Sequence, residues 1–200
     1  MLCNNDYKYI DNECLYTDKA TGVLLNKEGI TDYKELVVFE SFKVADKTEQ
    51  LKAKPIKIKF ANDLLKIHKF LFQDVYDWAG ELRKVEISKD GRQFLPMHSF
   101  PQAFAYLDKL LADYAETDKQ NKSAIAEKLA EILDAINFLH PFREGNGRTQ
   151  REFIRTLALQ KDYELDLNPL DSQSVYDRYM DGTINGKIPE LTGLILELLN

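Results

Sequence analysis

The segment "HPFREGNGRTQR", His140–Arg151, joins two helical patterns and concentrates polar chemistry in one short stretch. It contains one histidine, one glutamate, three arginines, and an asparagine between two glycines. Pro141 ends a helix that reaches it, and the glycines favour a turn. We therefore expect a helix, a turn and a second helix, with Phe142 anchored in the core.

The flanking sequences favour helices on both sides of this turn. Residues 123–140, with Ser123 as a candidate cap, place aliphatic side chains at helical steps on one face: Ile125, Leu129, Ile132, Leu133 and Ile136. Residues 148–162 carry a second apolar set: Phe153, Ile154, Leu157 and Ala158. The turn is thus predicted to lie between two packed helices.

The composition of the turn is typical of a phosphate site. Glycines let the backbone approach a ligand closely, and the free N–H groups at a helix start attract anions. Arg148 and Arg151 share one face of the second helix, although the helix dipole disfavours cations in its first turns. A bound polyanion would offset that cost, and arginine grips phosphate through paired donors.

Two further side chains add reactive chemistry to the turn. Glu144 supplies a carboxylate, and Mg²⁺ binds through one or two carboxylates together with phosphate oxygens. His140 is the only nearby side chain that exchanges a proton near neutral pH. Each residue alone has a structural explanation: a cap, a loop or a solvated arginine. Their coincidence favours a site for metal-assisted attack on a nucleotide phosphate.

Outward from the turn, the sequence predicts an all-α helical bundle with one short β-hairpin. The first thirty or so residues look irregular, and Thr31 or Asp32 is a candidate cap for a helix in which Leu36, Phe39 and Val44 form an apolar face. His68 is interpreted as a packing histidine. The other expected helices cover residues 61–80, with Gly80 as the stop, and residues 100–116, 174–182 and 189–199.

The hairpin is predicted at about residues 84–97. Val85 and Ile87 alternate with charged neighbours, and Asp90-Gly91 is a strong turn signal. A two-stranded hairpin is marginally stable alone, so it must lean on the helices, and its edges would be available to another chain.

Composition limits the classes of function. The 200 residues carry a formal net charge of −6, which argues against nucleic acid as the primary partner. The sequence has no apolar stretch long enough for a membrane span, no signal-peptide pattern, no internal repeat and no linker, so we expect a single domain over residues 1–200. Cys3 and Cys14 leave a disulfide open but fit a reducing bacterial cytoplasm better. P-loop and GxSxG patterns are absent.

The segment 140–151 also resembles the signature of Fic domains, His-x-Phe-x-(Asp/Glu)-Gly-Asn-Gly-Arg-x-x-Arg, with all eight fixed positions present. Similarity extends to "TGVLLNKEGITDYKEL", "IHKFLFQDVYDWAGELRKV" and the hairpin before "FLPM". The chain is therefore similar to Fic domains of bacterial secreted effectors and toxin–antitoxin modules. This resemblance implies a Fic-type helical core and transfer of AMP from ATP to a Tyr, Thr or Ser hydroxyl of a target protein.

The resemblance assigns roles by position. His140 would deprotonate the target hydroxyl, and Glu144 would hold Mg²⁺ on the α- and β-phosphates. Gly145, Asn146 and Gly147 would form the anion hole, Arg148 would contact the phosphates, and Arg151 would hold the γ-phosphate. A flap would clamp the target by strand addition; it comprises Ser88, Lys89, Asp90, Gly91, Arg92, Gln93 and Phe94.

Variants within the family favour AMP transfer here. The phosphorylating Doc branch has lysine in place of Gly147, and phosphocholine transferases tend to have alanine in place of Gly145. Fic proteins are often restrained by a (Ser/Thr)-x-x-x-Glu-(Gly/Asn) helix, but Glu28-Gly29 follows Leu24 and no copy is evident. We therefore expect a separate small antitoxin to supply the inhibitory glutamate.

Three alternatives stay open. The enzyme could use another nucleotide donor, it could remove AMP, or the chain could be a nucleotide-binding interaction module with little catalysis. Action inside the bacterium and delivery into a host or target cell are likewise both open.

Overall fold

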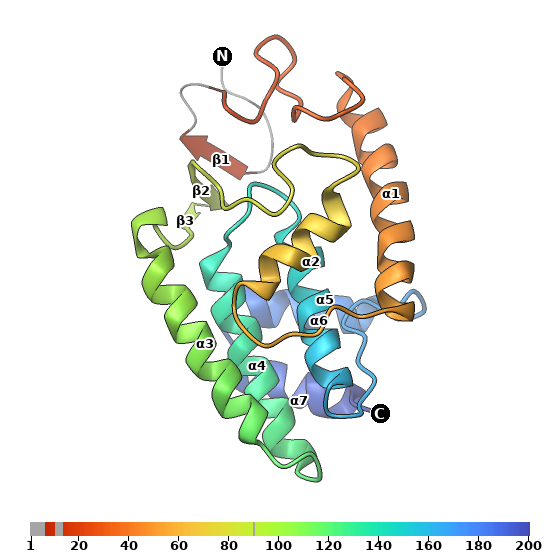
Figure 1. Ribbon diagram of the computed structural model, residues 1–200, viewed down its shortest axis with the longest axis vertical. Coiled ribbons are helices and arrows are strands. Elements are labelled where there is room, and N and C mark those ends of the chain that lie inside the picture. The colour runs from red at the N-terminus through yellow and green to blue at the C-terminus, as the bar shows by residue number, and fades with distance from the viewer. Residues whose placement is uncertain (1–6, 11–13, 90) are drawn as a thin grey trace. The chain divides into compact units, whose positions relative to one another are not determined.

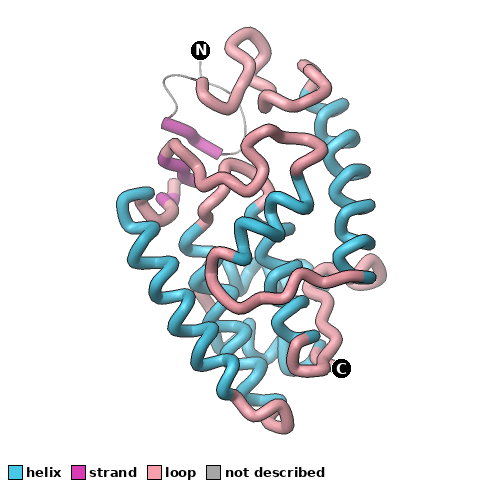
Figure 2. Tube along the Cα trace, in the orientation of Figure 1, coloured by secondary structure: helices cyan, strands magenta, loops and turns pink. Residues whose placement is uncertain are grey.

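The computed structural model describes residues 7–10, 14–89 and 91–200, and helices dominate them, which confirms the all-α class (Figure 2). None of the helices in these ranges is long and apolar enough to cross a membrane. The chain divides into two compact units. The first comprises residues 1–56, 65–100 and 140–146, and the second comprises 57–64, 101–139 and 147–200.

The first unit contains a long helix, α1 (Tyr33–Ala53), that begins at the predicted cap (Figure 1). The Asp32 side chain accepts a hydrogen bond of 2.9 Å from the Glu35 N–H, which satisfies one unpaired donor of the first turn. Leu36 and Val44 are buried as expected. Phe39, the third residue of the predicted apolar face, instead lines an open groove.

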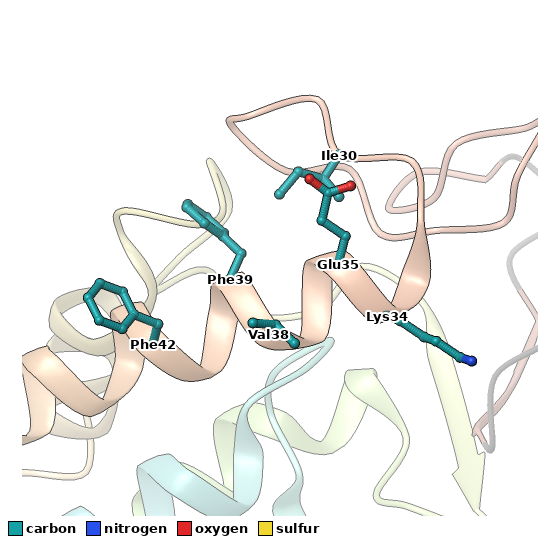
Figure 3. A pocket seen from close by; sticks show the side chains of 6 residues that line it. All are labelled: Ile30, Lys34, Glu35, Val38, Phe39 and Phe42. Carbon is teal, nitrogen blue, oxygen red and sulfur yellow. The ribbon is translucent and has the colours of Figure 1, made fainter.

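This groove lies on α1 and is almost entirely apolar. Val38, Phe39 and Phe42 project from the helix. Glu35 lies beside Ile30 of the preceding loop, and Lys34 lies toward the start of the helix (Figure 3). The side chains of Val38 and Phe42 are 70% and 72% exposed. No residue of segment 140–151 lines this groove, so it is distinct from the predicted site.

The helix predicted over residues 61–80 is shorter in the structure, where α2 spans Asp63–Phe72. The N–H groups of Val75 and Tyr76 both bond to the Phe72 carbonyl, so the chain leaves the helix in successive turns. Gly80 is therefore no helix stop. It lies close against α2, because a Cβ there would come within 2.7 Å of the Lys69 Cβ.

The predicted hairpin is present as β2 (Glu86–Lys89) and β3 (Arg92–Gln93), with Gly91 at a φ of 77°. The expectation that it stands alone was wrong. β1 (Tyr7–Ile10), in the segment that looked irregular, pairs antiparallel with β2, from Tyr7 opposite Lys89 to Ile10 opposite Glu86. The strand order β1-β2-β3 leaves β3 at one edge. A third strand stabilises a hairpin that is marginal by itself.

The second unit is built from helices close to their predicted ranges. They are α3 (Phe100–Glu116), α4 (Lys122–Leu139), α5 (Asn146–Leu159), α6 (Gln173–Asn185) and α7 (Ile188–Leu198). α4 packs against α6 and α7, and all five predicted aliphatic residues of α4 are buried. Ser123 is not the cap of α4. Asn121 accepts from the Ala124 N–H at 3.1 Å and has that role.

Candidate functional site

His140 directly follows α4 and occupies an unusual backbone conformation. Its φ is 42°, in the left-handed region that non-glycine residues seldom adopt. The residue is 7% exposed, and its ring stacks on Phe94 with centroids 3.7 Å apart and planes 15° apart. The candidate base is thus held against the residue that follows β3, at the flap.

A buried arginine joins the flap to the turn that carries His140. Arg83 donates from Nε to the His140 carbonyl at 3.0 Å, and its own N–H donates to the Pro141 carbonyl at 2.8 Å. Its other nitrogens donate to the Val85 and Leu95 carbonyls and to the Glu86 carboxylate. Burial lowers the pKa of Arg83 and Glu86 opposes that shift. This residue therefore couples the strands to the turn.

Sequence reasoning did not single out Arg83. The available signal was its place in "WAGELRKV", a segment that carries part of the family resemblance. From the sequence, an arginine that precedes a strand is expected to be exposed. Here Arg83 is 3% exposed, and each of its three guanidinium nitrogens donates to a carbonyl or a carboxylate.

His68 is fully buried, and it does more than pack. Its ring stacks on Phe142 at 3.8 Å and on Phe72 at 4.7 Å between centroids. Nδ1 accepts the Gly80 N–H at 2.8 Å, so Nε2 carries the ring hydrogen and donates to the Glu144 carbonyl at 3.0 Å. His68 thereby fixes the backbone of the residue expected to bind metal.

Gly145 is required by packing as well as by backbone conformation. Its φ is 80°, and a Cβ on it would lie 2.3 Å from Cζ of the buried Phe72 ring. Its N–H donates to the Glu144 carboxylate at 2.8 Å. The prediction attributed the glycine to close approach of a ligand, whereas the structure adds close approach of Phe72.

Asn146 is the first residue of α5, and its side chain bridges back to the backbone of Phe142 at the beginning of the turn. Its side chain accepts the Phe142 N–H at 2.9 Å and donates to the Phe142 carbonyl at 2.8 Å. The side-chain amide is therefore engaged within the turn. Because Asn146 is the first residue of α5, its backbone N–H is one of those that a helix leaves without an intrahelical partner.

The remaining motif residues belong to the second unit. Gly147 and Arg148 are half-buried on α5. Arg151 faces two tyrosines of α6, with its Cζ 5.7 Å from the Tyr176 ring centroid and 5.5 Å from that of Tyr179. Among the described residues no carboxylate forms an ion pair with Arg151.

Within the described residues no three His, Cys, Asp or Glu side chains gather into a metal cluster. The single half-buried carboxylate of Glu144 suits Mg²⁺, which takes most of its ligands from phosphate and water. Ser88 and Lys89 lie in β2, and Arg92 and Gln93 form β3. Asp90 and Cys3 lie outside the described residues.

Comparison with known proteins identifies the family of this site. The family model of the Fic/DOC family matches residues 57–158. The chain belongs to the Fic/DOC family. A relative of this family, "Protein adenylyltransferase VbhT" of Bartonella schoenbuchensis, is 36% identical over 84% of the chain and 35% of VbhT. The chain thus spans about a third of the length of that relative.

A second relative matches almost end to end. "Probable protein adenylyltransferase y4lH" of Sinorhizobium fredii is 32% identical over 96% of both chains. Among solved structures, the N-terminal Fic domain of a VirB-translocated Bep effector from Bartonella quintana has a TM-score of 0.80 over 92% of this chain and 91% of its own, at 23% identity. BepC of Bartonella tribocorum, solved with AMPPNP, has a TM-score of 0.80 over 92% of this chain and 96% of its own, at 22% identity. These structures share the Fic fold.

Proposed function

We propose that this Fic protein transfers AMP from ATP to a Tyr, Thr or Ser hydroxyl of a target protein. The observation that carries the proposal is the turn itself, with His140 held after α4 and the Gly145–Asn146 backbone at the start of α5. The names of the relatives support it, since both are called protein adenylyltransferases.

The reaction is an in-line displacement at the α-phosphorus. The His140 imidazole takes the proton of the target hydroxyl, whose oxygen forms a bond to that phosphorus. The bond from the α-phosphorus to the oxygen that bridges it to the β-phosphorus breaks, and pyrophosphate leaves. The backbone N–H groups at 145–147 stabilise the developing charge, with Arg148 and Arg151 on the phosphates.

Glu144 is the residue proposed to hold Mg²⁺. When bound, the ion would neutralise charge on the phosphates. The hydrogen bond from the Gly145 N–H to the Glu144 carboxylate, together with the His68 bond to its carbonyl, keeps this residue at the turn.

The target would dock on the flap by adding a strand to β3. One side of β2 is already occupied by β1, and β3 is the edge of the sheet. Phe94 follows β3 directly and contacts the ring of His140. A strand bound at this edge therefore runs close to the candidate base, and its backbone N–H and C=O groups would set the register.

The proposal predicts protein labelling that depends on His140. Incubation with Mg²⁺, ATP labelled in the α-phosphate and a bacterial or host lysate should transfer label to protein. Substitution His140→Ala should reduce it by a factor of at least about a hundred, the usual contribution of a general base. Equal labelling by the variant would exclude His140 as the base.

The choice of donor separates the remaining alternatives. ATP, GTP and UTP labelled at the α-phosphate should be compared under the same conditions, and we expect ATP to be preferred. Preference for another donor would keep the enzyme but change its reaction. Release of AMP from modified proteins would indicate removal, and nucleotide binding without any labelling would indicate an interaction module.

We further propose that a separate antitoxin supplies an inhibitory glutamate to Arg151. The sequence lacks an inhibitory motif, and no described carboxylate pairs with that arginine. The chain expressed alone should therefore slow growth and label host proteins. Harmless expression of a folded chain without self-modification would contradict an external brake.

The site of action is part of the same proposal. We propose that the chain acts in the bacterial cytoplasm. The alternative is delivery into another cell, which is supported by two similar structures that are VirB-translocated effectors.

A further inference from the structure

In the second unit, the guanidinium of Arg151 lies against two aromatic rings and not against a carboxylate of the described residues. Tyr176 and Tyr179 lie one helical turn apart on α6, with ring centroids 5.9 Å apart and planes tilted by 41°. The Arg151 guanidinium lies within 6 Å of both centroids. At this distance the negative faces of the rings attract a cation without neutralising its charge.

Tyr179 is itself fixed, so it can act as a support. It is 1% exposed, and its hydroxyl accepts a 2.5 Å hydrogen bond from Gln150 Nε2. Burial raises the pKa of Tyr179, so the phenol remains neutral beside the arginine.

α6 is in turn anchored to its neighbours on the other side. Asn137 of α4 donates to the Thr183 carbonyl at 2.8 Å. Gly182 lies so close to α7 that a Cβ would meet Leu191 Cδ2 at 2.5 Å. The backbone that carries both tyrosines is therefore set by helix packing, and Arg151 is oriented by a rigid surface.

We propose that Tyr176 and Tyr179 are positioning residues that orient Arg151 and thereby make the site prefer a nucleoside triphosphate over a diphosphate. This rests on the proposed role of Arg151 at the γ-phosphate. An arginine side chain loses much conformational entropy when it binds a ligand. An aromatic support orders the side chain before the ligand arrives, so the entropy cost of binding is smaller. An acidic support would do the same but would compete with phosphate for the guanidinium.

The test measures binding without turnover. Dissociation constants are determined with Mg²⁺ for ADP and for an ATP analogue with a methylene bridge between the α- and β-phosphates. Tyr176→Leu is the main variant because Tyr176 is half-buried, and Tyr179→Phe removes only the hydroxyl. Tyr106→Leu, on the exposed side of α3, is the matched control.

We expect Tyr176→Leu to weaken the triphosphate analogue about three- to tenfold, the range of one cation–π contact, and to leave ADP unchanged. Tyr179→Phe should give a smaller loss of the same kind, and Tyr106→Leu none. In an Arg151→Ala background, Tyr176→Leu should have no further effect on the ratio of the two constants.

Equal weakening of ADP and the analogue by Tyr176→Leu would overturn the proposal, and so would the same loss when Arg151 is absent. An unchanged ratio in Arg151→Ala alone would also overturn it, since that arginine would not sense the γ-phosphate. None of these readouts needs AMP transfer, so their failure is distinct from failure of the labelling experiment.

Discussion

Among single residues, Gly145 is the position where we predict the clearest effect of a substitution on stability. Gly145→Ala places a Cβ 2.3 Å from the Phe72 ring and puts alanine at a φ of 80°. We expect the free energy of unfolding to fall by about 2–5 kcal/mol, from overpacking and left-handed strain together. Urea denaturation followed by circular dichroism would measure it.

Gly29→Ala is the matched control for backbone strain. Gly29 has a φ of 67° but no atom within 4 Å of an added Cβ. It should cost about 1 kcal/mol. Similar losses in the two variants would show that Phe72 yields to the methyl group and that the steric explanation is wrong.

The motif residues could be named from the sequence, but their supports could not. His140, Glu144 and Arg151 are recognisable because their chemistry is concentrated in twelve positions. Arg83 and His68 are distant from the motif in the chain. Their structural role lies in the carbonyl group of the motif to which each side chain donates a hydrogen bond. That depends on tertiary packing, which no local pattern encodes.

At the scale of elements, α1 has one face that matters for stability and one that does not. Leu51 is 1% exposed and Phe42 is 72% exposed on the same helix. Leu51→Ala should lower the free energy of unfolding by about 2–5 kcal/mol, whereas Phe42→Ser should change it by less than about 0.5 kcal/mol. Thermal or urea unfolding would compare them. A large loss in Phe42→Ser would mean that the groove is closed in solution.

Long helices were predicted well and short strands were not. α3, α4 and α5 follow sustained apolar periodicity, so their existence and approximate bounds are readable from the sequence. β1 has four residues and is stabilised by pairing with β2, some eighty residues away. α2 ends at Phe72, whose carbonyl accepts from the N–H groups of both Val75 and Tyr76, whereas the apolar pattern of the sequence continues beyond that point.

At the scale of the whole molecule, we predict that the chain unfolds as one domain. α2, α3 and α5 each contain residues assigned to both compact units, so a unit cannot unfold without breaking a helix of the other. Trp78, the only tryptophan, reports the first unit, and far-ultraviolet circular dichroism reports helices throughout. The two signals should share one urea midpoint. Separate midpoints would mean two domains.

The left-handed backbone of His140 has a consequence for how this protein can change over generations. A histidine at a φ of 42° costs on the order of 1–3 kcal/mol, which glycine would largely avoid. His140→Ala keeps the strain and removes the base, whereas His140→Gly removes both. Substitution of His140 by glycine would therefore abolish activity and at the same time stabilise the fold. A lineage is expected to keep histidine here only while selection for the reaction continues.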